Sequence, residues 1–547
     1  VDNQPEQSIP MIGVAVNETD MDVVSEFFEL FKTPWERAVP GQRYRVVLVT
    51  DGSYSAVNAE VVLIYGVGKL EIDREVGVAA RRVSGPANIE WEGIAFPIYN
   101  GARVFESAHQ ERVPQLQGKS VAYRACIEGR ILWRIGYDLL SEIRFLLEEG
   151  QPVEHALTPA LEFHIAVLRH FLTLCRIPFV EVPPRPHGYD FICCLTHDVD
   201  FFGIRRHLFD RTLIGFLYRA SLGTAIDLTS GRRSLKDACR NWLAFLSLPF
   251  VFLRVLPDFW RPFEDYAKVE NRKSSTFFLV PFKGKAGVAP DGSLNKWRAT
   301  PYGIDDVRSH LKAAAAGGSE LALHGLDAWR DTEAGRDELN QLVSLTAQKT
   351  TGVRMHWLYF DRESPRRLEK AGFDYDSTCG FNETIGYRAG TLQVFRPLGC
   401  STLMELPMAI MDSALFSSGR MGLTPTEALT LIRTIIMKAK QFGGAIVINW
   451  HERSLAPERL LGRVYGALLD LVKEGNHVWF AKANEAVQWF RWRRSIGFSV
   501  KDSLSNCVKV SAPYGVGTGG EIRIYRPDQA HAEIISWDGR TPIELCV

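Results

Sequence analysis

The stretch Phe191-Ile192-Cys193-Cys194-Leu195-Thr196-His197-Asp198-Val199-Asp200 decides the fold of this chain. It is an apolar run that follows a turn signal at Pro186-His187-Gly188, so it predicts a buried strand. The run ends in two aspartates, Asp198 and Asp200. At the carboxyl end of a parallel strand, this spacing aims both carboxylates at the mouth of a barrel or crevice, where α/β enzymes keep their catalytic groups. One carboxylate could hold a metal ion while the other acts as a base; alternatively, the pair caps a helix N-terminus.

The bulk composition is that of a globular protein with several domains. At 547 residues, the chain is too long for a single core and suggests roughly two to four domains. Hydrophobic residues make up 46% of the chain and charged residues 23%, which is ordinary for a folded protein. The formal net charge is zero, which provides no general attraction for nucleic acid, so we expect no nucleic-acid partner.

The sequence predicts no transmembrane span, because no apolar run reaches the roughly 18 residues that such a helix needs. The nearest run, WLAFLSLPFVFLRVL from Trp242 to Leu256, is interrupted by Pro249 and Arg254 and is typical of a buried or interfacial helix. The residues from Val1 onward lack the charged-then-apolar pattern of a signal peptide. Nine scattered cysteines without a CxxC pair favour reduced thiols. We therefore expect a cytoplasmic protein, with peripheral contact to a membrane left open.

Residues 1–185 are predicted to form an N-terminal α/β domain. β-Branched runs at 45–49 and 61–65 predict strands, and long helical patterns follow at about 131–149 and 158–175. A stiff proline-rich segment then joins this domain to the rest of the chain. No motif in the domain indicates its role.

Residues 186–499 alternate strands with helices. Further predicted strands lie at 275–280, 320–323, 352–356, 403–406, 445–450 and 478–480. Repeated β-then-α units predict a parallel sheet, either open or closed into a barrel. A helical insert at 204–263, rich in aromatic and basic side chains, interrupts the alternation as a lid, an interaction surface or a further helical layer. Short β runs at 500–547 predict a small β appendage.

Polar side chains follow several of these predicted strands. His324 follows one strand, Arg354 and His356 end the next, and His451 follows a later one. In a parallel barrel, all of them gather on the same face as the aspartates at 198 and 200. Aspartate and histidine together suit a divalent cation such as zinc, with one position open to water. Taken singly, each histidine could instead be a hydrogen-bonded packing residue.

The order of these motifs resembles that of the NodB-homology polysaccharide deacetylases (carbohydrate esterase family four), over about residues 190–490. The segments that carry the resemblance are Thr196-His197-Asp198-Val199-Asp200, Ser275-Thr276-Phe277-Phe278, Glu320-Leu321-Ala322-Leu323-His324, Arg354, Gly372-Phe373-Asp374-Tyr375-Asp376-Ser377-Thr378, Glu405-Leu406-Pro407 and Asn449-Trp450-His451. The resemblance implies an α/β fold with a deformed (β/α) barrel of the polysaccharide deacetylase type. The N-terminal α/β domain and the C-terminal β appendage lie outside it.

The resemblance also implies a role for each strand-end residue. Asp200 and His324 would bind the metal ion, which we expect to be zinc, with cobalt and nickel as alternatives. Asp198 would accept the proton of the attacking water, and Arg354 would hold this carboxylate ionised and oriented. His451 would protonate the departing amine. Arg354 could instead be a structural salt bridge.

One position departs from the family pattern. A second metal-binding histidine normally follows the first by four residues, and here that position is Ala328. His356, two residues after Arg354, could supply the missing imidazole, and Asp327 is the other candidate. We expect His356 to be the third ligand.

Three further residues are predicted to contact the substrate: Trp357, Arg388 and Trp450. Tryptophans near strand ends can stack on sugar rings, although they are also common in cores, and an arginine between glycines can reach an anionic sugar. The predicted function is the metal-dependent removal of N-acetyl or O-acetyl groups from a polysaccharide or related amidosugar. The alternatives are an inactive glycan-binding relative and a hydrolase of another non-peptide amide. The sequence predicts no oligomeric state.

Overall fold

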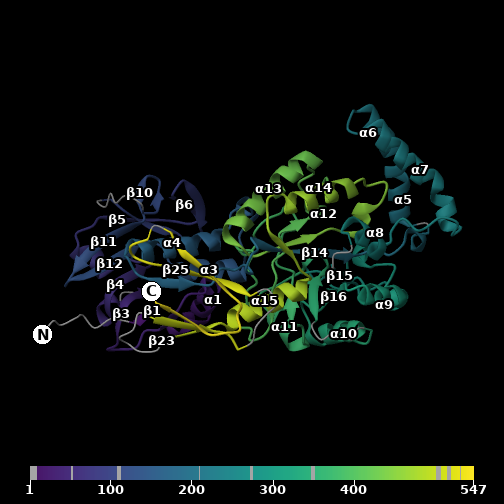
Figure 1. Cartoon of the computed structure of the whole chain (residues 1–547). Helices are drawn as coiled ribbons and strands as arrows, with labels where there is room; N and C mark the ends of the chain where they lie inside the picture. Colours follow the sequence, from purple (N-terminus) through teal and green to yellow (C-terminus); the bar gives the residue numbers. More distant parts are fainter. Residues whose placement is uncertain are drawn as a thin grey trace.

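The computed structural model describes residues 9–50, 53–106, 113–208, 210–271, 275–345, 351–500, 507–513, 519–529 and 531–546 (Figure 1). A curled parallel sheet surrounded by helices occupies one side of the molecule. Two N-terminal sheets and the C-terminal strands occupy the other side. The helical insert extends beyond the curled sheet.

The curled parallel sheet is a deformed (β/α) barrel, as predicted. Its strand order is β19-β18-β17-β16-β15-β14-β21-β20, so β14 lies between the next strand in sequence and one that comes much later. The strands at the two ends of this order are separated only by residues 406–409. The backbone N–H of Leu406 donates to Asp376 on one side, and that of Ala409 donates to Val447 on the other. This one segment therefore spans the opening and closes the sheet.

The strands of the barrel are short, and helices alternate with them. The strands are β14 (Phe191–Val199), β15 (Thr276–Leu279), β16 (Glu320–Gly325), β17 (Gly352–Met355), β18 (Tyr375–Asp376), β19 (Met404–Glu405), β20 (Ile410–Met411), β21 (Ala445–Asn449) and β22 (Val478–Phe480). The helices are α8 (Pro262–Val269), α9 (Arg308–Ala316), α10 (Thr332–Val343), α11 (Ser364–Ala371), α12 (Asp412–Phe416), α13 (Pro425–Phe442), α14 (Gly462–Lys473) and α15 (Ala483–Ser495).

Strand β14 is buried along its whole length, which explains its continuous apolar run. Residues 191–193 pair with β22, and residues 196–199 pair with β15, both in parallel. Strand β21 pairs along the other edge, from Ile192 to Thr196. The predicted strand is confirmed, and it places Asp198 at the carboxyl end of the central strand of the barrel.

The N-terminal part contains a sheet with the order β11-β12-β4-β3-β1-β2 and an antiparallel sheet with the order β5-β8-β10-β9-β6-β7. The first consists of β1 (Ile9–Ala15), β2 (Trp35–Arg37), β3 (Arg43–Val49), β4 (Asn58–Tyr65), β11 (Ala122–Ile127) and β12 (Arg130–Ile135). The second consists of β5 (Ala80–Val83), β6 (Ala87–Trp91), β7 (Ile94–Ile98), β8 (Ala102–Phe105), β9 (Gln115–Leu116) and β10 (Lys119–Ser120). The helices of this part are α1 (Met21–Phe31), α2 (Glu71–Glu75), α3 (Leu139–Glu148) and α4 (Ala160–Leu174).

The predicted helix at 131–149 is wrong in its first half. Residues up to Ile135 form strand β12, which is parallel to β4 and antiparallel to β11. Helix α3 begins only after Asp138, whose side chain accepts a hydrogen bond from the Ser141 N–H at 3.1 Å. The apolar residues around Trp133 satisfied a helical pattern, but pairing with strands from both sides decides their conformation.

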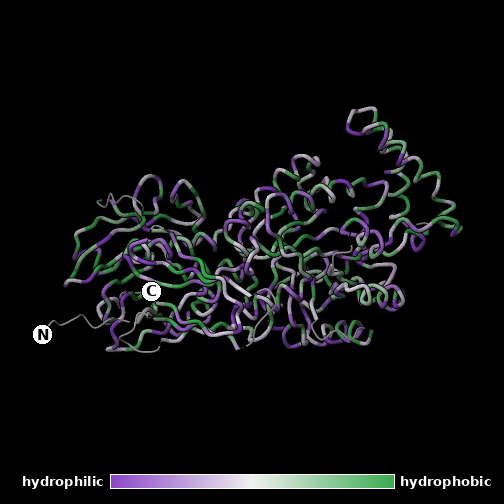
Figure 2. The backbone as a smooth tube through the Cα atoms, viewed as in Figure 1, coloured by the Kyte–Doolittle hydropathy of each residue, from purple (hydrophilic) through white to green (hydrophobic). Residues whose placement is uncertain are grey.

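The helical insert consists of α5 (Arg211–Tyr218), a π-helical segment (Arg219–Gly223), α6 (Thr224–Thr229) and α7 (Leu235–Phe252). Figure 1 shows α6 and α7 projecting away from the barrel, and Figure 2 shows that hydrophobic residues recur along them. Within the described residues, no helix has both the length and the apolar character needed to cross a membrane.

The C-terminal strands pair with more than one part of the chain. Strands β25 (Gly520–Tyr525) and β26 (Glu533–Trp537) form a sheet with β13 (Phe179–Glu181), which precedes the barrel. Strands β23 (Gly497–Val500), β24 (Cys507–Ser511) and β27 (Ile543–Cys546) form another. Cys507, which lies opposite Cys546 in the strand register, is disulfide-bonded. The expectation that the thiols are reduced is therefore wrong at Cys507.

Arg493 of α15 links the barrel to the N-terminal part, and we expect Arg493→Ala to lower the free energy of unfolding by about 3–5 kcal/mol. This fully buried guanidinium donates to the carbonyl oxygens of Glu29 at 3.1 Å, Leu30 at 3.0 Å and Val182 at 2.7 Å. Its removal leaves these buried acceptors unsatisfied. Urea unfolding measures the loss, and Arg433→Ala, at an exposed arginine, should change stability by less than about 1 kcal/mol. Equal losses in both variants would contradict the linking role of Arg493.

Candidate metal centre and active site

Asp198 receives hydrogen bonds on both of its carboxylate oxygens. Arg354 Nη1 donates to Oδ1 at 2.8 Å, and Asn449 Nδ2 donates to Oδ2 at 2.7 Å. The Asp198 N–H donates to Asn449 Oδ1 at 3.2 Å, which fixes the orientation of that amide. The guanidinium is itself held, because it also donates to the Thr196 hydroxyl and to the carbonyl and hydroxyl oxygens of Ser377. The Asp198 carboxylate therefore has one defined orientation at the end of β14.

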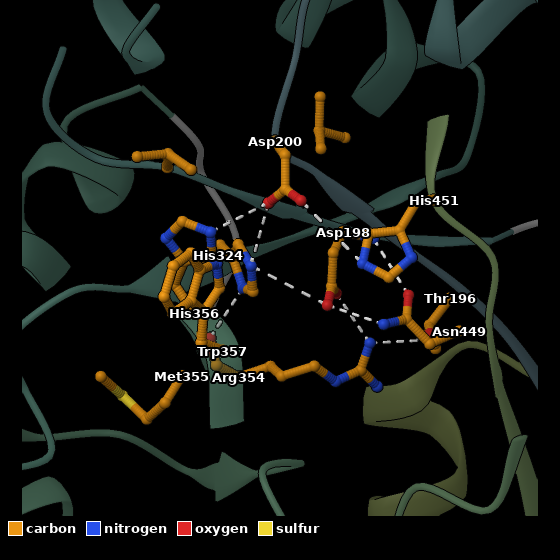
Figure 3. A network of polar contacts seen from close by, with 12 residues as sticks. Thr196, Asp198, Asp200, His324, Arg354, Met355, His356, Trp357, Asn449 and His451 are labelled. Atoms are coloured by element: carbon orange, nitrogen blue, oxygen red, sulfur yellow. Dashed lines mark hydrogen bonds and ion pairs between the residues drawn. The ribbon is translucent and has the colours of Figure 1, made fainter. Parts of the chain in front are cut away.

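Asp200 has a different environment, because its buried Oδ1 accepts no hydrogen bond from the described part of the chain. The Nε2 atoms of His324 and His356 each lie 3.4 Å from this oxygen. One ligand atom from each of the three residues lies within 4.8 Å of the others. In Figure 3 the two imidazole rings approach the Asp200 carboxylate from the same side. Asp200, with its free oxygen, is thus the aspartate suited to a cation, and Asp198 is not.

The protonation of His324 suits a metal ligand. Its Nδ1 lies 3.0 Å from the carbonyl oxygen of Arg354, and a carbonyl can only accept a hydrogen bond. The neutral ring therefore carries its proton on Nδ1 and leaves the Nε2 lone pair directed at Asp200. One carboxylate oxygen and two imidazole nitrogens, with a further position open, form a donor set that zinc and related cations use. The trio of Asp200, His324 and His356 could hold a metal ion.

A strained turn places His356. Trp357 and Leu358 follow it with φ values of 66° and 55°, in the left-handed region that non-glycine residues rarely adopt. The Arg298 guanidinium donates to the His356 carbonyl at 2.8 Å, and the Asn382 side chain donates to the Trp357 carbonyl at 2.9 Å. Strain of this kind persists only where the surrounding structure enforces it, and it is common at functional sites. Here the turn aims the His356 ring at the candidate metal site.

His451 faces Asp200 from the opposite side of the site (Figure 3). Its Nε2 lies 4.0 Å from Asp200 Oδ2. Its Nδ1 lies 2.5 Å from Oδ1 of Asp412, and its backbone N–H donates to Oδ2 of the same carboxylate at 2.9 Å. The Ser454 hydroxyl also donates to Asp412. The His451 ring is therefore oriented, and its Nε2 edge is turned toward the candidate metal site.

Burial and neighbouring charges set the protonation of these groups. Burial alone would raise the pKa of Asp198, but the Arg354 guanidinium together with His324 and His451 outweighs it and holds this pKa below its usual value. Burial alone would lower the pKa of His451, but the Asp412 carboxylate, with smaller contributions from Asp200 and Asp198, outweighs it and raises this pKa to about 10. Burial lowers the pKa of His356 to about 3, so its ring is neutral, as a metal ligand requires. At neutral pH, the Asp198 carboxyl group is therefore ionised and the His451 imidazole protonated.

A cavity of about 1290 Å³ opens over the site. The predicted residues that line it are Asp198, Asp200, His324, His356, Trp357 and His451. Arg354 is fully buried directly behind Asp198, so it positions that carboxylate and does not face the cavity. Arginines from three other segments also line the cavity, among them Arg219 of the helical insert, Arg420 and Arg453.

The structure groups His356, and not Asp327, with the other candidate ligands. Asp327 Oδ1 accepts the Val288 N–H at 2.8 Å, and its Oδ2 lies 3.4 Å from Lys285 Nζ. Both oxygens are therefore used in a loop outside the trio. Ala328, at the position of the absent histidine, is fully buried.

Two predicted substrate-binding residues lie away from the cavity. Trp450 is fully buried, with its ring 5.0 Å from that of Tyr465, so it is a core residue. The Arg388 guanidinium donates to the Glu149 carbonyl at 3.2 Å and lies 5.2 Å from the Phe381 ring, at the contact with the N-terminal part. Both assignments to substrate binding are corrected. A tight turn and a strand end are visible in a sequence, but the direction of a side chain is not.

Asp412 was not among the predicted site residues, and no role was predicted for Asn449. Asp412 directly follows β20, so the strand-end rule that found His451 applies to it as well. Strand β20 has only two residues and gave too weak a signal to be predicted separately. Asn449 lay inside a quoted motif, but its contact with Asp198 depends on two strands that are far apart in sequence.

We expect Asp412→Asn to move the alkaline limb of the pH–activity profile to lower pH and to reduce kcat about 10- to 100-fold. The negative charge of Asp412 favours the protonated form of His451, so replacing Asp412 with a neutral asparagine lowers the pKa of His451. Steady-state kinetics from about pH 6 to about 10 measure the limb, and an NMR titration of His451 reports the same shift without catalysis.

Ser454→Ala is the matched control, because it removes a different contact of Asp412 and leaves both charges of the pair. The Asp412–His451 pair also stabilises the fold. Since the pKa of His451 is raised from 6.5 to about 10, this contribution is complete below 6.5 and is lost as the pH rises toward 10. An unchanged His451 titration in Asp412→Asn would show that the pair is not coupled.

The barrel and the clustered aspartate and histidine side chains define an α/β protein with a candidate metal site at the carboxyl ends of its strands. No protein-family model matches the sequence, and no curated protein matches it. The chain is similar to a solved structure described as a polysaccharide deacetylase from Mycobacterium smegmatis, with 19% sequence identity and a TM-score of 0.33, over 57% of this chain and 95% of that one.

Two other solved structures are similar to this chain. One is that of Agd3, described as a novel carbohydrate deacetylase, with 9% identity and a TM-score of 0.36, over 98% of this chain and 100% of that one. The other is described as a polysaccharide deacetylase involved in O-antigen biosynthesis from Bordetella bronchiseptica, with 12% identity and a TM-score of 0.23, over 56% of this chain and 91% of that one.

Proposed function

We propose that this protein is a metal-dependent hydrolase that removes acetyl groups from the amino sugars of a glycan. One observation carries the proposal: an ionised carboxylate, a candidate metal site and a protonated imidazole face one cavity. These are Asp198, the trio centred on Asp200, and His451. Hydrolysis of an amide needs a base to activate water and an acid to protonate the amine, and this arrangement supplies both.

The proposed metal ligands, base and acid lie on different sides of the cavity. A divalent cation held by Asp200, His324 and His356 would polarise a carbonyl group and make water more acidic. Asp198 accepts the proton of the attacking water, and Arg354 and Asn449 keep the carboxylate turned toward the cavity. His451 donates a proton from Nε2 to the departing amine, and Asp412 keeps the imidazole charged until that transfer.

The motif resemblance and the volume of the cavity support a glycan as the substrate. A volume of about 1290 Å³ is large for one acetyl group and suits several sugar units. Trp357 lines the cavity beside the candidate metal site and is 37% exposed, so its ring is accessible for contact with a sugar. We take zinc as the expected metal, because two imidazoles and one carboxylate are ligands that zinc prefers.

Metal analysis combined with a substrate panel tests the proposal. We expect near-stoichiometric metal in the purified protein, its loss in Asp200→Ala and His324→Ala, and acetate release from N-acetylglucosamine oligomers that a chelator abolishes. O-acetylated sugars and cyclic amides complete the panel. Metal binding with turnover of cyclic amides alone would identify a hydrolase of another amide. No metal after incubation with zinc, cobalt or nickel would leave a glycan-binding protein.

A further inference from the structure

The outer face of helix α7 carries a stripe of exposed apolar side chains. Leu243, Leu246, Phe250 and Leu253 are 67%, 65%, 51% and 71% exposed. They recur at intervals of three or four residues, so they share one face of the helix. A helix on the surface of a globular protein normally turns such a stripe toward the core, and this one faces away from it.

The inward face of α7 is a separate stripe. Its buried residues are Ala238, Asn241, Ala244, Leu248 and Val251. At about 100° per residue they lie on the side of the helix opposite the exposed stripe. The packing of α7 against its neighbours therefore needs none of the exposed leucines.

A second exposed stripe runs along the first part of the insert, from α5 to α6. Ile214, Tyr218, Leu222 and Ile226 are between 50% and 66% exposed and follow one another at intervals of four residues. They extend from α5 through the π-helical segment into α6. The wider turn of a π-helix keeps such a spacing close to one line. Both parts of the insert thus carry unpartnered apolar residues.

The insert is also strongly basic. Residues 204–263 contain ten arginines and lysines and four aspartates, a net charge of +6 in a chain whose formal net charge is zero. Exposed basic residues lie beside both stripes, among them Arg211, Lys236, Arg240 and Arg254. The Arg211 guanidinium lies 4.0 Å from the ring centre of Trp297, another exposed aromatic residue.

We propose that the helical insert docks this protein on the surface of an anionic lipid membrane. Helices that lie in a membrane interface combine leucine, isoleucine and aromatic side chains on one side with arginine and lysine around them, and they carry little acidic charge. The apolar stripes enter the boundary between head groups and acyl chains, and the basic residues contact anionic head groups. The insert lies on the membrane surface and does not cross it.

Charge favours a lipid surface over a second copy of this chain. A two-fold dimer would place the same patch of both copies together, and the two inserts, each with a net charge of +6, would then repel each other. An anionic surface instead neutralises that charge. The insert also forms part of the cavity wall, through Tyr218, Arg219, Arg232 and Arg233. Docking would therefore hold the cavity close to the membrane surface.

Vesicle flotation tests the proposal without any assay of hydrolysis, so its outcome is independent of the proposed function. The protein is mixed with vesicles of phosphatidylcholine alone or with phosphatidylglycerol added. We expect flotation only with the anionic vesicles, and at least about a tenfold loss of affinity in the triple variant Leu243→Gln, Leu246→Gln, Phe250→Gln. Lys236→Gln and Arg254→Gln should each cost about fivefold.

The matched control is the triple variant Val39→Gln, Met437→Gln, Ile534→Gln, which removes equally exposed apolar side chains outside the insert. It should float like the parent, and circular dichroism should show that both triple variants are folded. Absence of flotation with anionic vesicles at low salt would overturn the proposal, as would equal affinity of the parent and the insert variant. A dimeric parent that the insert variant converts to a monomer would overturn it in favour of self-association.

Discussion

Asp198→Asn is expected to lower kcat by about three orders of magnitude, while the metal content stays near that of the parent. The substitution removes the only charge of the proposed base but leaves Asp200, His324 and His356 in place. An asparagine also has a single acceptor oxygen where the carboxylate offers one to Arg354 and another to Asn449. We therefore expect a stability loss of about 1–3 kcal/mol from one mismatched hydrogen bond.

The double variant Asp198→Asn, Asn449→Asp separates these two effects. The carboxylate introduced at position 449 can accept both from the side-chain amide introduced at position 198 and from the backbone N–H of that position, so the hydrogen bonds between the two positions are restored. We expect stability to recover while activity stays low, because the carboxylate has moved to the neighbouring strand. Elemental analysis, urea unfolding and acetate release are measured on the same preparations. Loss of metal in Asp198→Asn would instead mean that Asp198 is the ligand and Asp200 the base.

The second large effect is expected at the third metal ligand. His356→Ala should lower metal affinity at least about 100-fold, because it leaves only one imidazole and one carboxylate for the ion. Asp327→Ala should leave the metal affinity within about twofold of the parent, because Asp327 lies outside the trio. Residues that do not bind the ion change its affinity by more than about twofold mainly when they are hydrogen-bonded to one of the ligands. Competition with a chromogenic chelator measures both affinities.

A structural control is needed, because the His356 ring is buried. His356→Gln keeps a polar side chain of similar volume at this position. If it loses as much metal as His356→Ala, the loss cannot be due to collapse of the cavity. Comparable small losses in His356→Ala and Asp327→Ala would remove both residues from the metal site. A full loss in Asp327→Ala alone would restore the alternative that the sequence left open.

The carboxyl ends of parallel strands explain why much of the site could be predicted. Asp198, Asp200, His324 and His451 each follow an apolar run, and a barrel brings all such ends together whatever their separation in sequence. Asp412 was missed because β20 is too short to produce a run. The directions of the Arg388 and Trp450 side chains were also beyond prediction, because they depend on packing partners from other segments.

In the fold, too, features that depend on local apolar runs could be predicted, and features that depend on partners from other segments could not. The buried β14 and the alternating units after it were predicted from runs that are mainly apolar, as is typical of parallel strands covered on both faces. The error at residues 131–135 has a different origin. The partners of β12 lie in β4 and β11, and a pattern of apolar residues alone does not distinguish an amphipathic helix from a strand that finds such partners.

The position of β14 between β15 and β21 has a consequence for synthesis of the chain. Its pairing with β21 joins residues about 250 positions apart, so one edge of β14 stays unpaired until the second partner has left the ribosome. The apolar insert is made during this interval. Barrel closure is therefore a late and slow step in folding, since contacts of such long sequence separation require a large loop to close first. Nascent chains that end before Ala445 should accordingly depend on chaperones, whereas chains extended beyond Phe480 should not.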